Sequence, residues 1–168
     1  MDVKKLKLSR RKKKLIYRLN NLCFGMHGHL TALLKDLHYF FYFKKHSKCE
    51  DAEVYLKIVF FHLEQIIVIC RLIETLGEHP EVLAYKNNHI DYHRIKRTCK
   101  IDCRVAILDS LSTQLLILKE YLNIKEIAFE QNAIKIIDDC IESIKNQMRT
   151  LSENTTKKHT ENAENIRF

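Results

Sequence analysis

Residues that break helices are rare in this chain, and their scarcity limits its fold more than any other feature. Only one proline and three glycines occur among the 168 residues, and Gly77 and Pro80 lie together at the end of one long segment. A β-sandwich of this length would need many more turn residues, whereas long helices need few. We therefore expect an all-α fold with one domain and a sizeable core.

Apolar residues recur at steps of three and four along four segments, which is the spacing of a helix face that packs against other helices. The expected helices span about residues 15–43, 52–76, 92–121 and 125–151. Short breaks follow the first helix at residues 44–51 and the third at Asn123. The looser segment 81–91 is long enough to travel the length of a bundle. The pattern predicts an antiparallel four-helix bundle with a long crossover between its second and third helices.

Each expected helix has a stripe of residues that should face the core. In the first helix the stripe is Leu19, Cys23, Met26, Leu30, Leu33, Leu37 and Phe40. In the second it is Tyr55, Val59, His62, Ile66, Ile69, Ile73 and Leu76. In the third it includes Cys99, Cys103, Ala106 and Ser110, and in the fourth Ala133, Ile137, Cys140, Ile144 and Met148.

Positive charge is concentrated at the start of the chain. The formal net charge is +8, and residues 1–20 carry all of it, because the remaining residues hold 20 basic and 20 acidic side chains. Residues 1–14 therefore form a basic arm that could bind nucleic acid or another anion weakly, or simply keep the chain soluble. The cationic side chains of the arm are those of Lys4, Lys5, Lys7, Arg10, Arg11, Lys12, Lys13 and Lys14. At the other end, the polar residues 152–168 predict a disordered tail.

The sequence argues against a membrane or secreted protein. No apolar run reaches the roughly 18 residues that a bilayer span requires. The basic start lacks the apolar stretch of a secretory signal. The six cysteines lack the dense spacing of a disulfide scaffold. We expect a cytoplasmic protein with reduced thiols and a capacity to form a homo-oligomer through its helix faces.

One histidine or cysteine interrupts or adjoins the apolar stripe of each expected helix. These residues are His29, His62, Cys103 and Cys140. Four facing helices could bring two imidazoles and two thiols to one point, which would suit a tetrahedral Zn²⁺ or a similar ion. Without metal, the cysteines would act as small core residues and the histidines would need hydrogen-bond partners. The sequence leaves both interpretations open.

Several short runs carry a family resemblance. They are His29–Ala32 in the first helix, Arg71–Pro80 at the end of the second, Asn87–Tyr92 in the crossover, Cys103–Ile107 in the third helix and Ile136–Cys140 in the fourth. These runs resemble the metal-bearing helices and linker of the ferritin-like superfamily, in its rubrerythrin, bacterioferritin and clostridial types. The resemblance covers residues 15–151 and implies a ferritin-like bundle.

The resemblance also implies which residues stand at the family's six metal-ligand positions. They are His29, His62, Gln65, Cys103, Cys140 and Ser143. None is a carboxylate, whereas the family's di-iron or di-manganese site uses four. Ordinary di-iron chemistry is therefore not expected. His29, His62, Cys103 and Cys140 would be the zinc ligands, with Gln65 and Ser143 beside them. The expected function is a non-catalytic metal-binding or structural one, with the metal-free form equally open.

Two alternatives remain at this stage. The basic arm could hold DNA, as in proteins of the miniferritin kind. A shift in helix register could instead bring Asp36, Asp102, Asp139 or Glu142 into a di-metal oxidoreductase site. Two further pairs share a helix face at a spacing of four residues, His89 with His93 and Cys99 with Cys103. Each pair could bind metal or could serve in packing.

Overall fold

The computed structural model describes the backbone of residues 3–81 and 101–164, and the side chains of residues 8–81 and 101–153. Every regular element in these ranges is a helix: α1 (Val3–Phe24), α2 (His29–Lys45), α3 (Cys49–Thr75), α5 (Cys103–Ile127) and α6 (Gln131–Glu164). The all-α prediction is confirmed for this part of the chain. No helix within it is long and apolar enough to cross a membrane.

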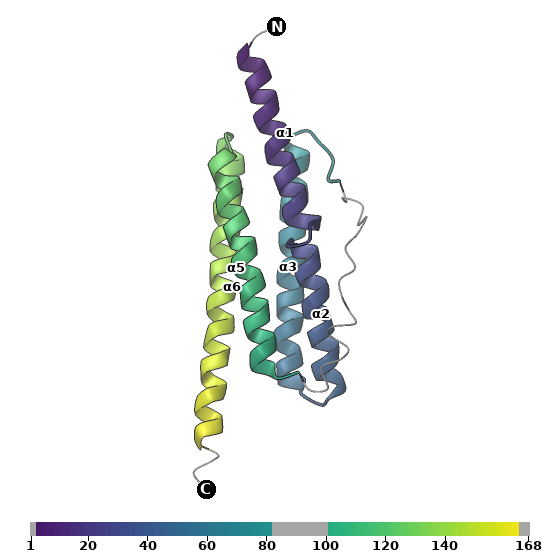
Figure 1. The fold of residues 1–168 in the computed structure, drawn as a ribbon, viewed down its shortest axis with the longest axis vertical. Coiled ribbons are helices and arrows are strands. Elements are labelled where there is room, and N and C mark those ends of the chain that lie inside the picture. Colours follow the sequence, from purple (N-terminus) through teal and green to yellow (C-terminus); the bar gives the residue numbers. More distant parts are fainter. Residues whose placement is uncertain (1–2, 82–100, 165–168) are drawn as a thin grey trace.

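The helices pack lengthwise beside one another as a bundle (Figure 1). α1 and α2 follow one another in a single broken column, and α3 returns beside them. α2 packs most extensively on α3, and α5 on α6. α3 and α5 run in the same direction, because α3 ends at the end of the bundle opposite to where α5 begins (Figure 1). The predicted crossover, residues 81–91, lies outside the described residues except for Glu81.

The expected first helix, 15–43, is wrong as a single element, because the chain turns between Phe24 and His29. Gly28 permits this turn. A Cβ atom at Gly28 would lie 2.5 Å from the carbonyl oxygen of Leu22, closer than real side chains approach. The turn also changes which face of the following helix is buried. α2 buries His29, Ala32, Asp36, Tyr39 and Phe43, whereas the predicted core residue Met26 is 57% exposed.

The other stripes agree better with the prediction. α3 has no internal break, and its expected core residues are buried except for the half-buried Ile66. α3 ends as expected at Gly77, which adopts the left-handed φ of 78° that glycine accepts without strain. The expected turn at Asn123 is wrong. α5 continues to Ile127, and α6 begins at Gln131 rather than near residue 125.

Both polar ends of the chain are helical where the structure describes them. α1 begins at Val3, so residues 3–14 of the expected basic arm form the first turns of a helix. α6 extends to Glu164, so the disordered tail expected from residue 152 onward is helical to that point. No glycine or proline interrupts either segment, which leaves helix formation unopposed by the two strongest breakers.

The buried apolar residues form two clusters, one toward each end of the bundle. The large cluster includes Leu19, Ile73, Ile117 and Ile137. The small cluster includes Phe43, Tyr55, Ile107 and Leu151. Buried polar residues of α2, α3 and α5 lie between the two clusters or at their border. This polar layer is the chemically distinctive part of the interior and consists of His29, Asp36, His62, Gln65, Ser110, Gln114 and Tyr121.

Candidate functional site: a buried polar layer

Three helices build the polar layer. His29 and Asp36 lie seven residues apart on the buried face of α2. His62 and Gln65 lie three residues apart on α3, and Ser110, Gln114 and Tyr121 share the buried face of α5. Spacings of three, four and seven residues return to the same side of a helix, which is why each helix contributes several members. All seven side chains are buried.

A chain of hydrogen bonds begins at Gln65 and passes through two imidazole rings. The Tyr121 hydroxyl donates to Gln65 Oε1 over 3.0 Å and lies 3.0 Å from His29 Nε2. The other nitrogen of His29, Nδ1, lies 2.9 Å from His62 Nδ1. The chain then reaches Asp36, whose Oδ2 is 3.5 Å from His62 Nε2. The Ser110 hydroxyl donates to Asp36 Oδ1.

Donor and acceptor chemistry assigns the protons along this chain. Burial, and secondarily the neighbouring His62, hold the pKa of His29 well below its ordinary value, so His29 is neutral. The Tyr121 proton goes to Gln65, so Tyr121 accepts from His29 Nε2–H. His29 Nδ1 then has no proton and must accept from His62 Nδ1–H.

The last contact of the chain, between His62 and Asp36, is longer than the others. His62 Nε2 lies 3.5 Å from Asp36 Oδ2 and makes no hydrogen bond among the described residues. This contact and the hydrogen bond from Ser110 offset part of the cost of burying the Asp36 carboxyl group.

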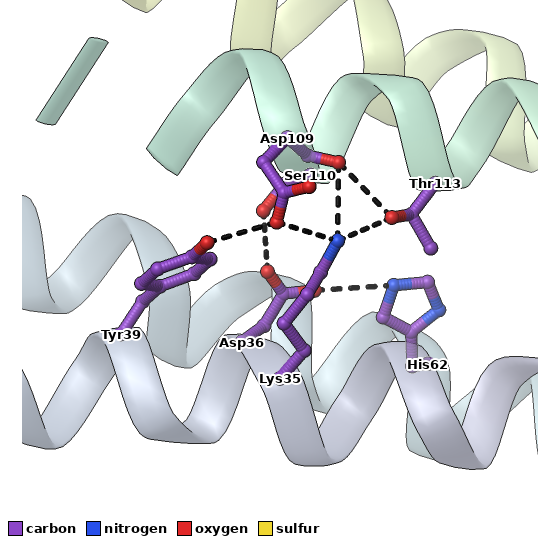
Figure 2. Close-up of polar contacts among 7 residues, drawn as sticks. All are labelled: Lys35, Asp36, Tyr39, His62, Asp109, Ser110 and Thr113. Atoms are coloured by element: carbon purple, nitrogen blue, oxygen red, sulfur yellow. Dashed lines mark hydrogen bonds and ion pairs between the residues drawn. The ribbon is translucent and has the colours of Figure 1, made fainter. Parts of the chain in front are cut away.

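A second ion pair, between Lys35 and Asp109, lies next to the polar layer. Lys35 Nζ lies 2.8 Å from Asp109 Oδ2 and also contacts Thr113, while Tyr39 donates to Asp109 Oδ2 over 2.8 Å. In Figure 2, Asp109 contacts Tyr39 and Lys35, whereas Asp36 contacts Ser110 and His62. The two carboxylates therefore have separate partners.

Gln114 is the member of the layer in which both polar side-chain atoms lack a hydrogen bond among the described residues. It is fully buried. It lies one turn after Ser110 and two turns before Tyr121 on the same face of α5, so it faces the layer. Buried amide atoms without partners are costly.

The structure brings together two of the four expected metal ligands, His29 and His62. Cys140 is buried on α6 near Tyr121, and burial raises the pKa of its thiol to about 11. Cys103 begins α5, where its thiol lies 3.2 Å from Asp51 Oδ1. Asp51 precedes His62 by eleven residues on α3, about 16 Å along the helix. The four side chains therefore do not meet at one point, and no group of three His, Cys, Asp or Glu in the described residues could hold a metal ion.

The remaining candidates fall at several places. Gln65 lies in the layer, and Ser143 is half-buried on α6. Of the carboxylates considered for a shifted register, Asp36 lies in the layer. Asp102 instead caps α5 by accepting from the Arg104 N–H, and Asp139 and Glu142 are exposed on α6. His89, His93 and Cys99 lie outside the described residues.

The basic residues of α1 differ in exposure. Arg10, Arg11, Lys13 and Lys14 are exposed, whereas Lys12 is half-buried and its ammonium lies near Gly77 at the end of α3. A cation is favourable at a helix C-terminus, so Lys12 has a structural position. Lys4, Lys5 and Lys7 lie on helical backbone, but their side chains are outside the described residues.

Comparison with known proteins does not identify a family for this chain. The chain matches no protein-family model, no curated protein and no solved structure.

Proposed function

We propose that this protein is a ferritin-like four-helix bundle in which the polar layer replaces a di-metal centre, and that its role is structural rather than catalytic. The observation that carries the proposal is the mutual pairing of His29 and His62, whose Nδ1 atoms lie 2.9 Å apart. Three of the four ring nitrogens of this pair make hydrogen bonds within the layer, and the fourth, His62 Nε2, lies 3.5 Å from Asp36 Oδ2. The imidazoles therefore have a role without metal.

Two further features support the ferritin-like part of the proposal. α3 and α5 run parallel, so their connection joins opposite ends of the bundle (Figure 1), as it does in bundles with one long crossover. The polar layer lies on facing helices between two apolar clusters, which is where bundles of this kind place inward-facing ligands.

The chemistry of the layer supports a non-catalytic role. A general acid or base must reach a substrate proton, but His29, His62 and Asp36 are fully enclosed and bonded to one another. The layer also offers Asp36 as its one carboxylate, whereas oxygen-activating di-metal sites use four. We therefore expect that mutation of the layer changes stability and helix register rather than a reaction rate.

Metal analysis of the purified full chain tests this proposal against zinc binding. We expect fewer than about 0.1 metal ions per chain and a melting temperature that a chelator does not change, because the hydrogen bonds need no ion. About one zinc per chain, lost in both His29→Gln and His62→Gln but retained in the surface control His79→Gln, would overturn it. That result would favour the His/Cys metal reading.

A second function, nucleic-acid binding by α1, is favoured by the four exposed cations Arg10, Arg11, Lys13 and Lys14. Phosphate contacts of this kind release counterions, so affinity should fall with salt by a slope of about −0.9 per contact. The variant in which all four become Gln should bind duplex DNA more weakly and with a shallower salt slope. The matched control neutralises four exposed cations elsewhere, namely Lys44 and Lys45 on α2 and Lys57 and Arg71 on α3. Equal loss in both variants would show only a general charge effect and would count against a site on α1.

A further inference from the structure

An exposed apolar stripe runs along the outer face of α5, opposite the face that holds the polar layer. Leu108, Leu115 and Leu122 follow one another at seven-residue intervals and are 61%, 54% and 47% exposed. The half-buried Leu111 and Leu118 lie between these leucines at spacings of three and four residues, on the same side of the helix. The three leucines span about 21 Å of helix. Contiguous apolar surface of this kind marks an interaction site in most soluble proteins.

The charges that flank this stripe identify its partner. Arg104 and Glu126 are both exposed, and each lies eleven residues from Leu115, on opposite sides. In two antiparallel helices related by a two-fold axis, residue i of one copy faces residue j of the other, and j faces i. If the axis passes through Leu115, Leu108 of each copy faces Leu122 of the other. The same register places Arg104 opposite Glu126 twice.

We propose that α5 is a self-association surface, on which a second copy of this chain packs antiparallel with Leu115 at the two-fold axis. Both the apolar stripe and the flanking charges are self-complementary in this single register. A closed two-fold pair is also the commonest form of homo-oligomer. The proposal does not depend on the function of the polar layer, because none of the stripe residues belongs to it.

The exposed stripe on α3 shows why the match on α5 is specific. Leu56, Phe60, Leu63 and Ile67 are spaced at four, three and four residues, and the last three are exposed. The register that pairs Leu56 with Ile67 and Phe60 with Leu63 brings no acidic side chain opposite a basic one. Glu53, for example, would face Cys70. The α3 stripe thus lacks the charge match and provides a control surface.

One contact between two helices is small by the standard of stable interfaces, so we expect a dimer that dissociates on dilution. Sedimentation equilibrium of the full chain over a wide concentration range measures this. Leu115→Lys would place two ammonium groups at the axis and should raise the dissociation constant at least about tenfold. The control Phe60→Lys on α3 should leave it unchanged. Helical circular dichroism should be unaffected in both variants, because both positions are exposed.

A charge exchange tests the register itself. Arg104→Glu should weaken the dimer by placing two acids opposite each other at both ends, and Glu126→Arg should weaken it in the same way with two bases. The double variant carrying both changes should regain the affinity of the parent chain. The proposal fails if the parent chain is monomeric at every concentration or if Phe60→Lys disrupts the dimer while Leu115→Lys does not. It also fails if the double variant is no tighter than either single variant.

Discussion

The large cluster and the polar layer are equally buried, but different forces hold them together. In the large cluster, side chains such as Leu19, Ile73 and Ile117 contribute through the apolar area they remove from water, which has no preferred direction. In the polar layer, each member depends on a particular donor or acceptor on another helix. Loss of one apolar group weakens the cluster in proportion to its size, whereas loss of one polar group leaves its partner unpaired.

The difference suggests separate contributions to folding. The large cluster joins α1, α3, α5 and α6 and supplies most of the gain from burial. The polar layer links α2, α3 and α5 through bonds that a sliding helix would break. We infer that the layer chiefly fixes helix register, a role known for some buried polar groups.

The largest effect should come from breaking the His62–Asp36 link. Asp36→Ala removes the partner of His62 and of Ser110 inside the bundle, which should lower the free energy of unfolding by about 3–5 kcal/mol. Asp109→Ala, at the half-exposed pair with Lys35, should cost only about 1 kcal/mol. Urea unfolding followed by circular dichroism measures both. Equal losses would mean that the buried and the exposed carboxylate are held in the same way.

Truncation in the large cluster should cost somewhat less. Ile73 is fully buried, and Ile73→Ala should lower the free energy of unfolding by about 3 kcal/mol, with Ile73→Val near 1 kcal/mol. Ile67→Ala, at an exposed position of the same helix, should change it by less than about 0.5 kcal/mol. The same urea series provides the values. A graded response at Ile73 and an abrupt one at Asp36 would sharpen the contrast between cluster and layer.

The pH dependence of stability below pH 7 isolates the layer from the large cluster, because burial raises the pKa values of the cluster's Cys23 and Cys140 thiols above their ordinary value of 9. The pKa of His29 is lower in the folded state than its ordinary value of 6.5, so the unfolded chain binds the proton more readily. Stability should therefore be fully present above pH 6.5 and should decrease as the pH falls below it, by up to about 1.4 kcal/mol per pH unit. His29→Gln should flatten this slope in urea titrations between pH 4 and 7, by about the same amount. An unchanged slope would contradict a neutral His29.

Tyr121 should limit stability at the alkaline end for the opposite reason. Burial raises the pKa of its hydroxyl well above the ordinary value of 10, so the folded chain retains the proton that the unfolded chain releases. The contribution of Tyr121 should hold below pH 10 and decrease above it. Tyr121→Phe should make the alkaline decrease in stability shallower, with the remainder due to other buried groups such as Cys140. An alkaline slope that is unchanged in Tyr121→Phe would contradict the raised pKa of Tyr121.

The sequence predicted the interior best where a helix is continuous. On α3 the apolar period placed His62 and Ile73 correctly, because no break changes the phase of the stripe. In the segment that forms α1 and α2, the spacing of three and four residues was continued from Leu19 past Gly28 as if the helix were unbroken. The prediction therefore placed Met26 in the core and missed Asp36. The signal that would have found Asp36 is its spacing of seven residues from His29, since both then share one helix face.

The polar layer was harder to predict, because a search for apolar periodicity passes over polar core residues. Gln114 and Tyr121 lie on the buried face of α5, yet their residue types alone do not distinguish them from surface residues. Cys103 was expected beside His29 from the family resemblance, but α5 begins at Cys103 itself. Its place at a helix start puts it at the end of the bundle rather than in its centre.

Gln114 offers the smallest test, and it has the opposite sign from the others. Its buried amide makes no hydrogen bond among the described residues, so replacing it removes a cost rather than a partner. Gln114→Leu keeps a similar volume and should raise the free energy of unfolding by about 1 kcal/mol. Gln65→Leu, which removes the acceptor of Tyr121, should lower it by a similar amount. If both changes were destabilising, Gln114 would belong to the bonded part of the layer, and the layer would extend along α5 from Ser110 to Tyr121 without interruption.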